Sequence, residues 1–201
     1  MFTGIVQGKA VIRGMVKKAD FMQLQVELPT NRCENLQLGA SIALNGTCLT
    51  VTGFENNLVN FDLIMETLRV TNLGQLSVGD EVNFERAAKF GDEIGGHVLS
   101  GHVHQQVTID RIEKPDNNWI IWFKAKPEWQ KYIFAKGFIG LNGCSLTVGE
   151  VKEGLFNVFL IPETLSMTTF GTLEQGAHIN MEIDAHTQAV VETVEQYMNN
   201  R

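Results

Sequence analysis

The chain has 201 residues, of which 44% are hydrophobic and 19% are charged, a composition typical of a folded globular protein. Its 16 basic and 23 acidic residues leave a net charge of −7, which argues against binding to the phosphate backbone of nucleic acids. The apolar runs are only a few residues long, so we expect no membrane-spanning segment.

The N-terminus and the cysteines indicate a cytoplasmic protein. Met1–Ile5 has neither a charged region nor an apolar stretch, so we predict no signal peptide. The three cysteines, Cys33, Cys48 and Cys144, are odd in number and lack the spacing of a metal site. Such sparse cysteines are typical of a reducing compartment, and we therefore expect a cytoplasmic chain.

The sequence repeats itself at a constant offset of 97 residues. Three blocks align at this offset: Phe2–Val6 with Leu99–Val103, Asn45–Val51 with Asn142–Val148, and Phe61–Glu85 with Val158–Glu182. Five of seven positions are identical in the second block, and 11 of 25 in the third. One offset shared by three separated blocks is hard to obtain by chance, so we predict a duplicated domain.

Each copy has the pattern of a β domain. Apolar and polar residues alternate over residues 22–28, as in a half-buried strand. The Asn-Gly pairs at 45–46 and 142–143 are strong signals for tight turns between strands. The Glu-Thr-Leu pieces at Glu66 and Glu163 are too short for more than a helical turn. Many short strands joined by Gly-rich turns favour an all-β fold with one small closed barrel per copy.

Differences between the copies mark candidate catalytic residues. Cys48 of the first copy aligns with Ser145 of the second. Cysteine is the better nucleophile at neutral pH because part of it is thiolate, whereas a serine hydroxyl needs a base. The alternative for Cys48 is a small buried apolar residue. Strand alternation places Thr50 beside Cys48 and Thr147 beside Ser145, which gives each copy a polar pair on one face.

The segment Gly95–His104 is rich in glycine and histidine. It contains G-x-x-x-x-G, but His102 and Val103 stand where a phosphate-binding loop has Lys and Ser or Thr, so such a loop is not favoured. His97, His102 and His104 raise the question of a metal site, with the last two on one strand face. Because further ligands and their supporting partners are missing, we predict no metal. The dinucleotide fingerprint G-x-G-x-x-G is also absent.

Three features in the second copy and beyond it leave alternatives open. Lys136 is either a solvated surface charge or a contact for an anion. Asp184 is either an acid–base group or the N-cap of a following helix. That helix either packs on its own barrel or mediates association, because its apolar residues form one stripe: Val190, Val191, Val194, Tyr197 and Met198.

As a set, several motifs resemble those of the riboflavin synthase family, alpha-chain type, and the resemblance runs essentially end to end. The motifs are Met1–Gly8, Asn45–Val51, Glu85–Asp92, Gly95–Val103 and Ile161–Leu165. The resemblance implies two similar six-stranded Greek-key barrels, residues 1–97 and 98–185. It further implies that the helix at 186–201 largely holds a homotrimer together.

The resemblance also implies the reaction. Two molecules of 6,7-dimethyl-8-ribityllumazine exchange a four-carbon unit, which gives riboflavin and 5-amino-6-ribitylaminouracil without a cofactor. The family places its working site between the first barrel of one subunit and the second barrel of a neighbour. In some organisms lumazine synthase encloses the enzyme, and we keep that association as an open alternative.

Carried over position by position, the resemblance implies two sets of substrate contacts. The first set is Gly4, Ile5, Val6, Cys48, Leu49, Thr50, Asp62, Leu63, Ile64, Met65, Glu66 and Thr67. The second set is Gly101, His102, Val103, Ser145, Leu146, Thr147, Phe159, Leu160, Ile161, Pro162, Glu163 and Thr164, with Lys136 reaching across.

We assign catalytic roles as hypotheses. Cys48, or water activated near it, adds to the ring of the acceptor lumazine. His102 together with Thr147 assists removal of a proton from the acidic methyl group of the donor. Ser145 and Asp184 then serve the later proton transfers or the elimination.

Two rival functions use the same fold. A non-catalytic lumazine- or flavin-binding fluorescent protein needs only one good pocket, whereas both copies here keep their polar pairs. A flavin-binding barrel of an electron-transfer protein needs an adjoining nucleotide domain, for which no residues remain. We therefore favour the enzyme.

Overall fold

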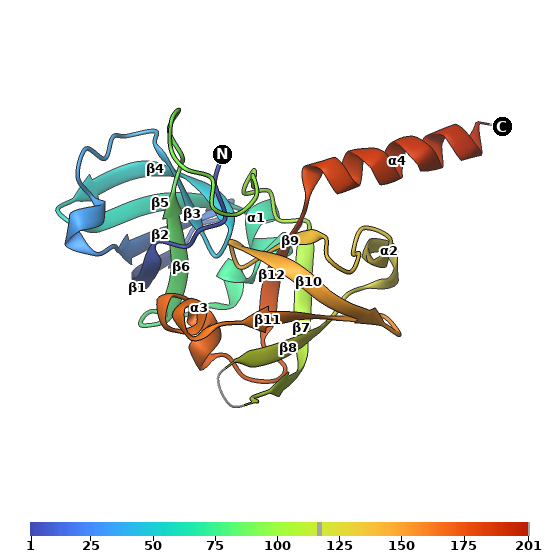
Figure 1. Ribbon diagram of the computed structural model, residues 1–201. Helices are drawn as coiled ribbons and strands as arrows, with labels where there is room; N and C mark the ends of the chain where they lie inside the picture. The colour runs from blue at the N-terminus through green and yellow to red at the C-terminus, as the bar shows by residue number, and fades with distance from the viewer. Residues whose placement is uncertain (116–117, 201) are drawn as a thin grey trace.

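The chain folds into two antiparallel β-barrels and a C-terminal helix that projects away from both (Figure 1). This computed structural model describes residues 1–115 and 118–200. The first barrel contains β1 (Gly8–Lys17), β2 (Phe21–Glu27), β3 (Ser41–Leu44), β4 (Thr47–Glu55), β5 (Leu58–Ile64) and β6 (Glu81–Arg86). The second contains β7 (Gln105–Glu113), β8 (Trp119–Lys124), β9 (Phe138–Leu141), β10 (Cys144–Lys152), β11 (Leu155–Leu160) and β12 (His178–Ile183).

Short helical elements connect these strands, and one long helix follows the last of them. The α-helices are α1 (Met65–Val70), α2 (Pro127–Gln130), α3 (Pro162–Met167) and α4 (Ala185–Asn199). The 3₁₀ turns are Thr30–Arg32, Asn72–Gln75 and Thr169–Thr172. The Glu-Thr-Leu pieces lie in α1 and α3, each a short helix directly after a strand.

The two barrels have the same topology. Strands of the first barrel follow the closed order β1-β2-β5-β4-β3-β6. The second barrel has the order β7-β8-β11-β10-β9-β12, which is the first order shifted by six strands. Closure pairs the strands that would otherwise be edges. The predicted all-β class with two similar six-stranded barrels is confirmed.

The two Asn-Gly turns are tight turns that meet between the barrels. Asn45 and Gly46 have φ values of 44° and 77°, and Asn142 and Gly143 have 44° and 81°. Two positive φ angles in succession are the signature of the type I′ turn. A Cβ atom on Gly46 would lie 2.6 Å from the backbone nitrogen of Gly143. Glycine is therefore required both by the turn and by the contact between the copies.

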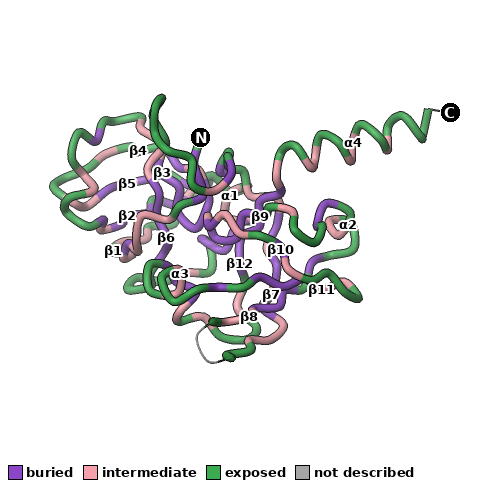
Figure 2. Tube along the Cα trace, viewed as in Figure 1, coloured by how far each residue is buried: buried purple, intermediate pink, exposed green. Residues whose placement is uncertain are grey.

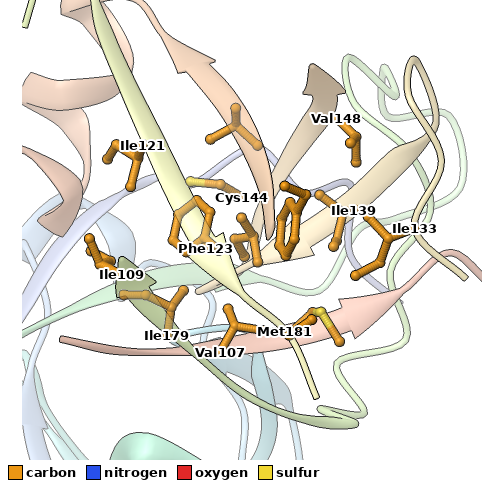
Figure 3. Close-up of a cluster of buried hydrophobic side chains, with 14 of the residues drawn as sticks. Val107, Ile109, Ile121, Phe123, Ile133, Ile139, Cys144, Val148, Ile179 and Met181 are labelled. Carbon is orange, nitrogen blue, oxygen red and sulfur yellow. The ribbon is translucent and has the colours of Figure 1, made fainter. Parts of the chain in front are cut away.

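Each barrel has its own apolar core, formed by the buried faces of its strands (Figure 2). In the second core, Phe123 and Phe156 stack with ring centroids 5.3 Å apart. Figure 3 shows Phe123 in this cluster together with Cys144, Ile139 and Met181. Because side chains alternate along a strand, filling the core from one face leaves the opposite faces available for a site.

Asparagine side chains connect the two barrels. The side-chain nitrogen of Asn83 donates to the carbonyl oxygen of Asn142 at 2.9 Å. Asn180, the equivalent residue of the second copy, donates to the carbonyl oxygen of Asn45 at 2.9 Å. All four residues are buried. Because these bonds are satisfied in one relative placement, they fix the orientation of one barrel on the other.

The C-terminal helix both packs on its own barrel and exposes an apolar stripe. Near its start, the side-chain oxygen of Gln188 lies 3.0 Å from Nε2 of His104, and Val191 packs against the second core. Further along, Val190 and Val194 are more than half exposed. Residue 201, the last of the predicted helical segment, lies outside the described residues. No helix in the described ranges is long and apolar enough to cross a membrane.

Candidate active site

A short segment before each barrel crosses to the other barrel. The crossing starts at Phe2 and Leu99, which exchange two backbone hydrogen bonds of 2.8 and 3.0 Å. Both side chains are buried in a small apolar cluster separate from the two barrel cores. We call the residues that follow, Thr3–Val6 and Ser100–Val103, the first arm and the second arm.

Each arm lies against the candidate nucleophile of the opposite copy. The carbonyl oxygen of Gly4 accepts a hydrogen bond from the backbone N–H of Ser145 at 2.8 Å. Correspondingly, the carbonyl oxygen of Gly101 accepts from the N–H of Cys48 at 2.8 Å. The two arms are therefore exchanged between the copies.

This exchange corrects the predicted grouping of the site residues. The prediction placed the first arm with Cys48 and the second arm with Ser145. The structure places the first arm with Ser145 and the second arm with Cys48. A repeat shows which residues are equivalent, but an arm of one copy can cross and contact the barrel of the other. His102 consequently lies on the Cys48 side of the chain, away from the grouping with Thr147.

Close contact explains the glycine at the centre of each arm. Gly4 has a φ of +74°, and a Cβ atom on it would lie 2.5 Å from the Cβ of Ser145. Gly101 has a φ of +81°, and its Cβ would lie 2.6 Å from that of Cys48. The left-handed backbone and the lack of space both favour glycine at these two positions.

We call the two pseudo-equivalent regions the Ser145 half-site and the Cys48 half-site. The Ser145 half-site contains a cavity of about 270 Å³ lined by Gly4, Ile5, Val6, Cys144, Ser145, Leu146, Glu163, Thr164, Met167 and Thr168. At the offset of 97, the corresponding residues of the Cys48 half-site are Gly101, His102, Val103, Thr47, Cys48, Leu49, Glu66, Thr67, Val70 and Thr71. Each half-site thus combines one arm with a strand and a short helix of the other copy.

Ser145 has a histidine partner that sequence reasoning missed. The Oγ atom of Ser145 lies 2.6 Å from Nδ1 of His97 and accepts a hydrogen bond from the His97 backbone N–H at 3.1 Å. The ring is buried and stacks on Phe138 with centroids 5.0 Å apart. Burial lowers the pKa of His97, against an opposing effect of Asp184, so the neutral form is favoured. A neutral imidazole at this distance is placed to accept the hydroxyl proton of Ser145.

His97 escaped prediction because the repeat gave it no counterpart. The aligned blocks begin at Phe2 and Leu99, two residues after His97, so a comparison of the copies could not flag it. It was weighed only as a metal ligand.

The Cys48 half-site differs in its reactive group and its surroundings. Cys48 is half-buried and adjoins the cluster of Phe2 and Leu99. Thr50 is exposed on the same strand face, as alternation predicted, and Thr147 is exposed beside Ser145. Among the residues that the structure describes, no ring nitrogen shares a hydrogen bond with the Cys48 thiol as His97 does with Ser145.

The other cysteine in this region is inert by burial. Cys144 precedes Ser145 on β10 and points into the second core (Figure 3). Burial, aided by the nearby charge of Glu85, raises the pKa of Cys144 to about 12. The thiol therefore stays protonated at neutral pH.

The two predicted contact stretches alternate between core and surface. Leu49, Leu63 and Leu160 are buried in the barrel cores, so only their backbone groups can face a ligand. The exposed side chains of these stretches are Asp62, Ile64, Met65, Glu66, Phe159, Ile161, Pro162 and Glu163. Glu66 is held by Arg69, whose guanidinium lowers the pKa of the Glu66 carboxyl through a 2.5 Å ion pair.

The histidines do not share a strand face, which corrects a second prediction. His102 and His104 both precede β7, which begins only at Gln105. His102 is exposed on the second arm, whereas His104 packs its ring against Trp129 at 5.5 Å. Within the described ranges, no group of three His, Cys, Asp or Glu residues is arranged to hold a metal ion.

Asp184 is the N-cap of α4. Its carboxylate accepts from the backbone N–H of Thr187 at 2.9 Å and from the Thr187 hydroxyl at 2.8 Å. Partial burial raises the pKa of Asp184, but these bonds more than offset it, so the pKa lies below its ordinary value. A group that is charged and engaged in capping is a poor general acid, which favours the capping alternative.

Lys136 is exposed and has a φ of 68°. Its backbone N–H donates to the carbonyl oxygen of Val148 at 2.8 Å.

Comparison with known proteins identifies this arrangement. The family model of the lumazine binding domain matches the chain twice, over residues 3–87 and 100–184. Riboflavin synthase of Escherichia coli (strain K12) is 55% identical over 199 residues, which cover 98% of this chain and 93% of that protein. The chain belongs to the riboflavin synthase family. Riboflavin synthase of Buchnera aphidicola subsp. Schizaphis graminum (strain Sg) is 45% identical over 197 residues, 98% of this chain and 95% of its own length.

Solved structures agree with this family assignment. LumP complexed with 6,7-dimethyl-8-(1'-D-ribityl) lumazine superposes with a TM-score of 0.83 at 27% identity, covering 92% of this chain and 99% of LumP. LumP complexed with riboflavin gives a TM-score of 0.86 at 28% identity, with 92% and 100% covered. The predicted family and the prediction of an enzyme, a transferase, are confirmed. The non-catalytic alternative is not favoured.

Proposed function

We propose that this chain catalyses the dismutation of two 6,7-dimethyl-8-ribityllumazine molecules into riboflavin and 5-amino-6-ribitylaminouracil. The observation that carries the proposal is the pair of half-sites, which have the same backbone framework but different reactive residues, Cys48 and Ser145. Two identical substrates must act as donor and acceptor of the four-carbon unit. A duplicated framework presents both in matched geometry, while the different residues allow different roles.

Positioning supplies a large part of the rate in such a reaction. Holding two reactants in a productive orientation can contribute roughly 7–11 kcal/mol. In this chain each half-site is built on a closed barrel and an arm, and Asn83 and Asn180 fix the orientation of the two barrels within the subunit. Rigid elements of this kind are suited to hold two ring systems face to face.

Within this proposal, the exchanged arms regroup the catalytic residues. His102 joins Cys48 in one half-site, whereas Ser145, Thr147 and His97 form the other. We place the working site between the Cys48 half-site of one subunit and the Ser145 half-site of a neighbour. His102 and Thr147 can then act on the same substrate pair from opposite subunits. Cys48 adds to the acceptor ring, and His97 accepts the hydroxyl proton of Ser145.

The proposed site requires association of subunits, and α4 supports a homotrimer. Its apolar stripe is exposed at Val190, Val194, Tyr197 and Met198, as is expected of an association surface. The helix is held at a fixed angle by an ion pair between Lys131 and Glu195 and by the hydrogen bond from Tyr132 to Glu192. We assign residues 186–201 to trimerisation and place the protein in the cytoplasm.

The proposed trimer is tested by placing charged side chains on the apolar stripe of α4. The double variant Val190→Lys and Val194→Lys should dissociate in sedimentation velocity and lose turnover, because the site loses its second subunit. Gln196→Lys, on the other face of α4, is the matched control and should remain associated. A double variant that stays trimeric argues against this role of the helix.

The activity itself is tested by incubating the purified protein with 6,7-dimethyl-8-ribityllumazine and following riboflavin by absorbance. The proposal expects one riboflavin for every two lumazines consumed. Bound but unconsumed lumazine would contradict it and would instead match a binding protein.

A further inference from the structure

Two buried glutamates hold the arms in place. Glu85 on β6 and Glu182 on β12 occupy equivalent positions at the offset of 97. They are only 3% and 6% exposed. Neither forms an ion pair with a side chain among the described residues, so their partners have to be sought in the backbone.

Each carboxylate receives three hydrogen bonds from one arm. Oε1 of Glu85 accepts from the Thr3 N–H at 2.6 Å and from the Thr3 hydroxyl at 2.8 Å, and Oε2 accepts from the Gly4 N–H at 3.1 Å. Glu182 repeats the pattern on the second arm. Its oxygens accept from the N–H and hydroxyl of Ser100 at 2.7 and 2.8 Å, and from the Gly101 N–H at 3.0 Å.

These bonds place the part of each arm that meets the half-site. Gly4, held by Glu85, bonds through its carbonyl to the N–H of Ser145. Gly101, held by Glu182, bonds in the same way to Cys48. The hydroxyls of Thr3 and Ser100 also accept from the next arm residues, Ile5 at 3.2 Å and His102 at 3.1 Å. Gly4 and Gly101 are thus bonded directly to a buried carboxylate, and Ile5 and His102 are connected to it through the hydroxyls of Thr3 and Ser100.

The chemistry of the acceptor explains why a carboxylate is used. Three donors converge on one side chain, and a carboxylate offers acceptors only. Charge-assisted bonds of this kind are about twice as strong as neutral ones. Burial raises the pKa of Glu85, and the bonds from Thr3 and Gly4 counteract part of that rise. An amide would turn an N–H₂ group toward an N–H donor and leave one of them without a partner.

We propose that Glu85 and Glu182 are positioning residues, each of which sets the geometry of one half-site through its arm. Glu85 governs the Ser145 half-site and Glu182 governs the Cys48 half-site, and each glutamate lies on the barrel opposite to the strand that carries the reactive residue. The proposal rests on the proposed function, because it takes the half-sites as the places where lumazine binds.

The test uses Glu85→Gln and Glu182→Gln, each the matched control of the other, in the full chain. Amide hydrogen exchange is read by NMR at the N–H groups of Ser145 and Cys48, which bond to the arms. We expect Glu85→Gln to accelerate exchange at Ser145 at least tenfold and to leave Cys48 unchanged. Glu182→Gln should do the reverse. Glu81→Gln, an exposed residue of β6 paired with Lys9, should change neither.

Kinetics with lumazine then separate positioning from stability. Each glutamine variant should raise the KM for lumazine about tenfold in assays run well below its own melting temperature, where the unpaired donor does not reduce the amount of folded protein. Equal acceleration at both amides in either variant, or no acceleration in both, would overturn the proposal. Selective acceleration of amide exchange together with unchanged turnover would also overturn the proposal for the glutamates, and the proposed activity would stand. Lack of turnover in the unmodified protein would instead overturn the proposed function, and the amides would still report whether the carboxylates hold the arms.

Discussion

The Ser145 and Cys48 half-sites have the same framework and different chemistry. Each consists of an arm with a central glycine, a strand after an Asn-Gly turn, and a short helix that begins at equivalent positions. Only Ser145 has a buried histidine at 2.6 Å, and only the Cys48 side has an exposed histidine on its arm. The two copies therefore share the geometry of the arms, and they differ in a few side chains around Ser145 and Cys48.

The largest expected effect comes from breaking the common framework. Gly101→Ala should reduce turnover about 10²-fold or more, because its Cβ would meet Cys48 and a displacement of about 1 Å can cost that much. Gly4→Ala should have a similar effect through Ser145. Gly91→Ala is the control, since its φ of +96° is also left-handed but nothing lies within 4 Å. Steady-state assays of the three variants check this, and equal loss in all three would assign the effect to backbone strain alone.

The next effect distinguishes the two reactive residues. Cys48→Ser should lower kcat between about tenfold and 10²-fold, because the serine lacks thiolate character and has no histidine partner. Cys33→Ser, at another half-buried cysteine of the first barrel, should leave kcat unchanged. Adding Ser145→Cys to Cys48→Ser should not restore activity. Restoration would show that the half-sites are interchangeable and would remove the proposed division of roles.

A smaller effect is expected at the arm of the Cys48 half-site. His102→Gln should slow exchange of the acidic methyl protons of lumazine in deuterated buffer roughly tenfold, because a general base is lost. Proton NMR measures the exchange directly. His186→Gln, whose side chain is almost fully exposed beyond β12, should exchange at the original rate. An unaffected rate in His102→Gln would remove His102 from proton transfer.

The smallest effect concerns pH and stability. Burial lowers the pKa of His97 in the folded chain. As the pH falls from neutral through this lowered pKa, the unfolded chain binds more protons than the folded chain. The free energy of unfolding therefore decreases over that pH interval. His97→Asn removes this group, so its melting temperature should change less between pH 7.5 and about 5. At high pH the variant should melt a few degrees lower, since a hydrogen bond contributes about 1 kcal/mol. His178→Asn, at an exposed histidine, should keep the original slope in thermal denaturation.

Much of the fold could be predicted because the relevant signals are local. The Asn-Gly turns, the alternating strands and the Glu-Thr-Leu helices follow from residues adjacent in sequence, and the structure has each of them. Alternation also placed Thr50 and Thr147 on the faces of Cys48 and Ser145. These features depend on backbone preferences that act within a few residues.

The misplaced features depend on contacts between distant residues. His102 and His104 were expected on one strand, but the chain leaves Leu99 in an arm and enters β7 only at Gln105. His97 was seen only as a candidate ligand, although it lies 48 residues from the serine that it contacts. No local pattern encodes such a contact.

Repeated spacing and residue chemistry along the chain established the duplication, the barrel class and the family, and they predicted Cys48 and Ser145 as reactive residues. The contacts that assign each arm to a half-site, pair His97 with Ser145 and bind the arms to Glu85 and Glu182 are visible in the folded chain alone. The physical reason is that two equivalent segments can pair with their own barrel or with the other. Packing of the central glycines against Ser145 and Cys48 belongs to the exchanged arrangement, whereas each buried carboxylate holds the arm of its own copy.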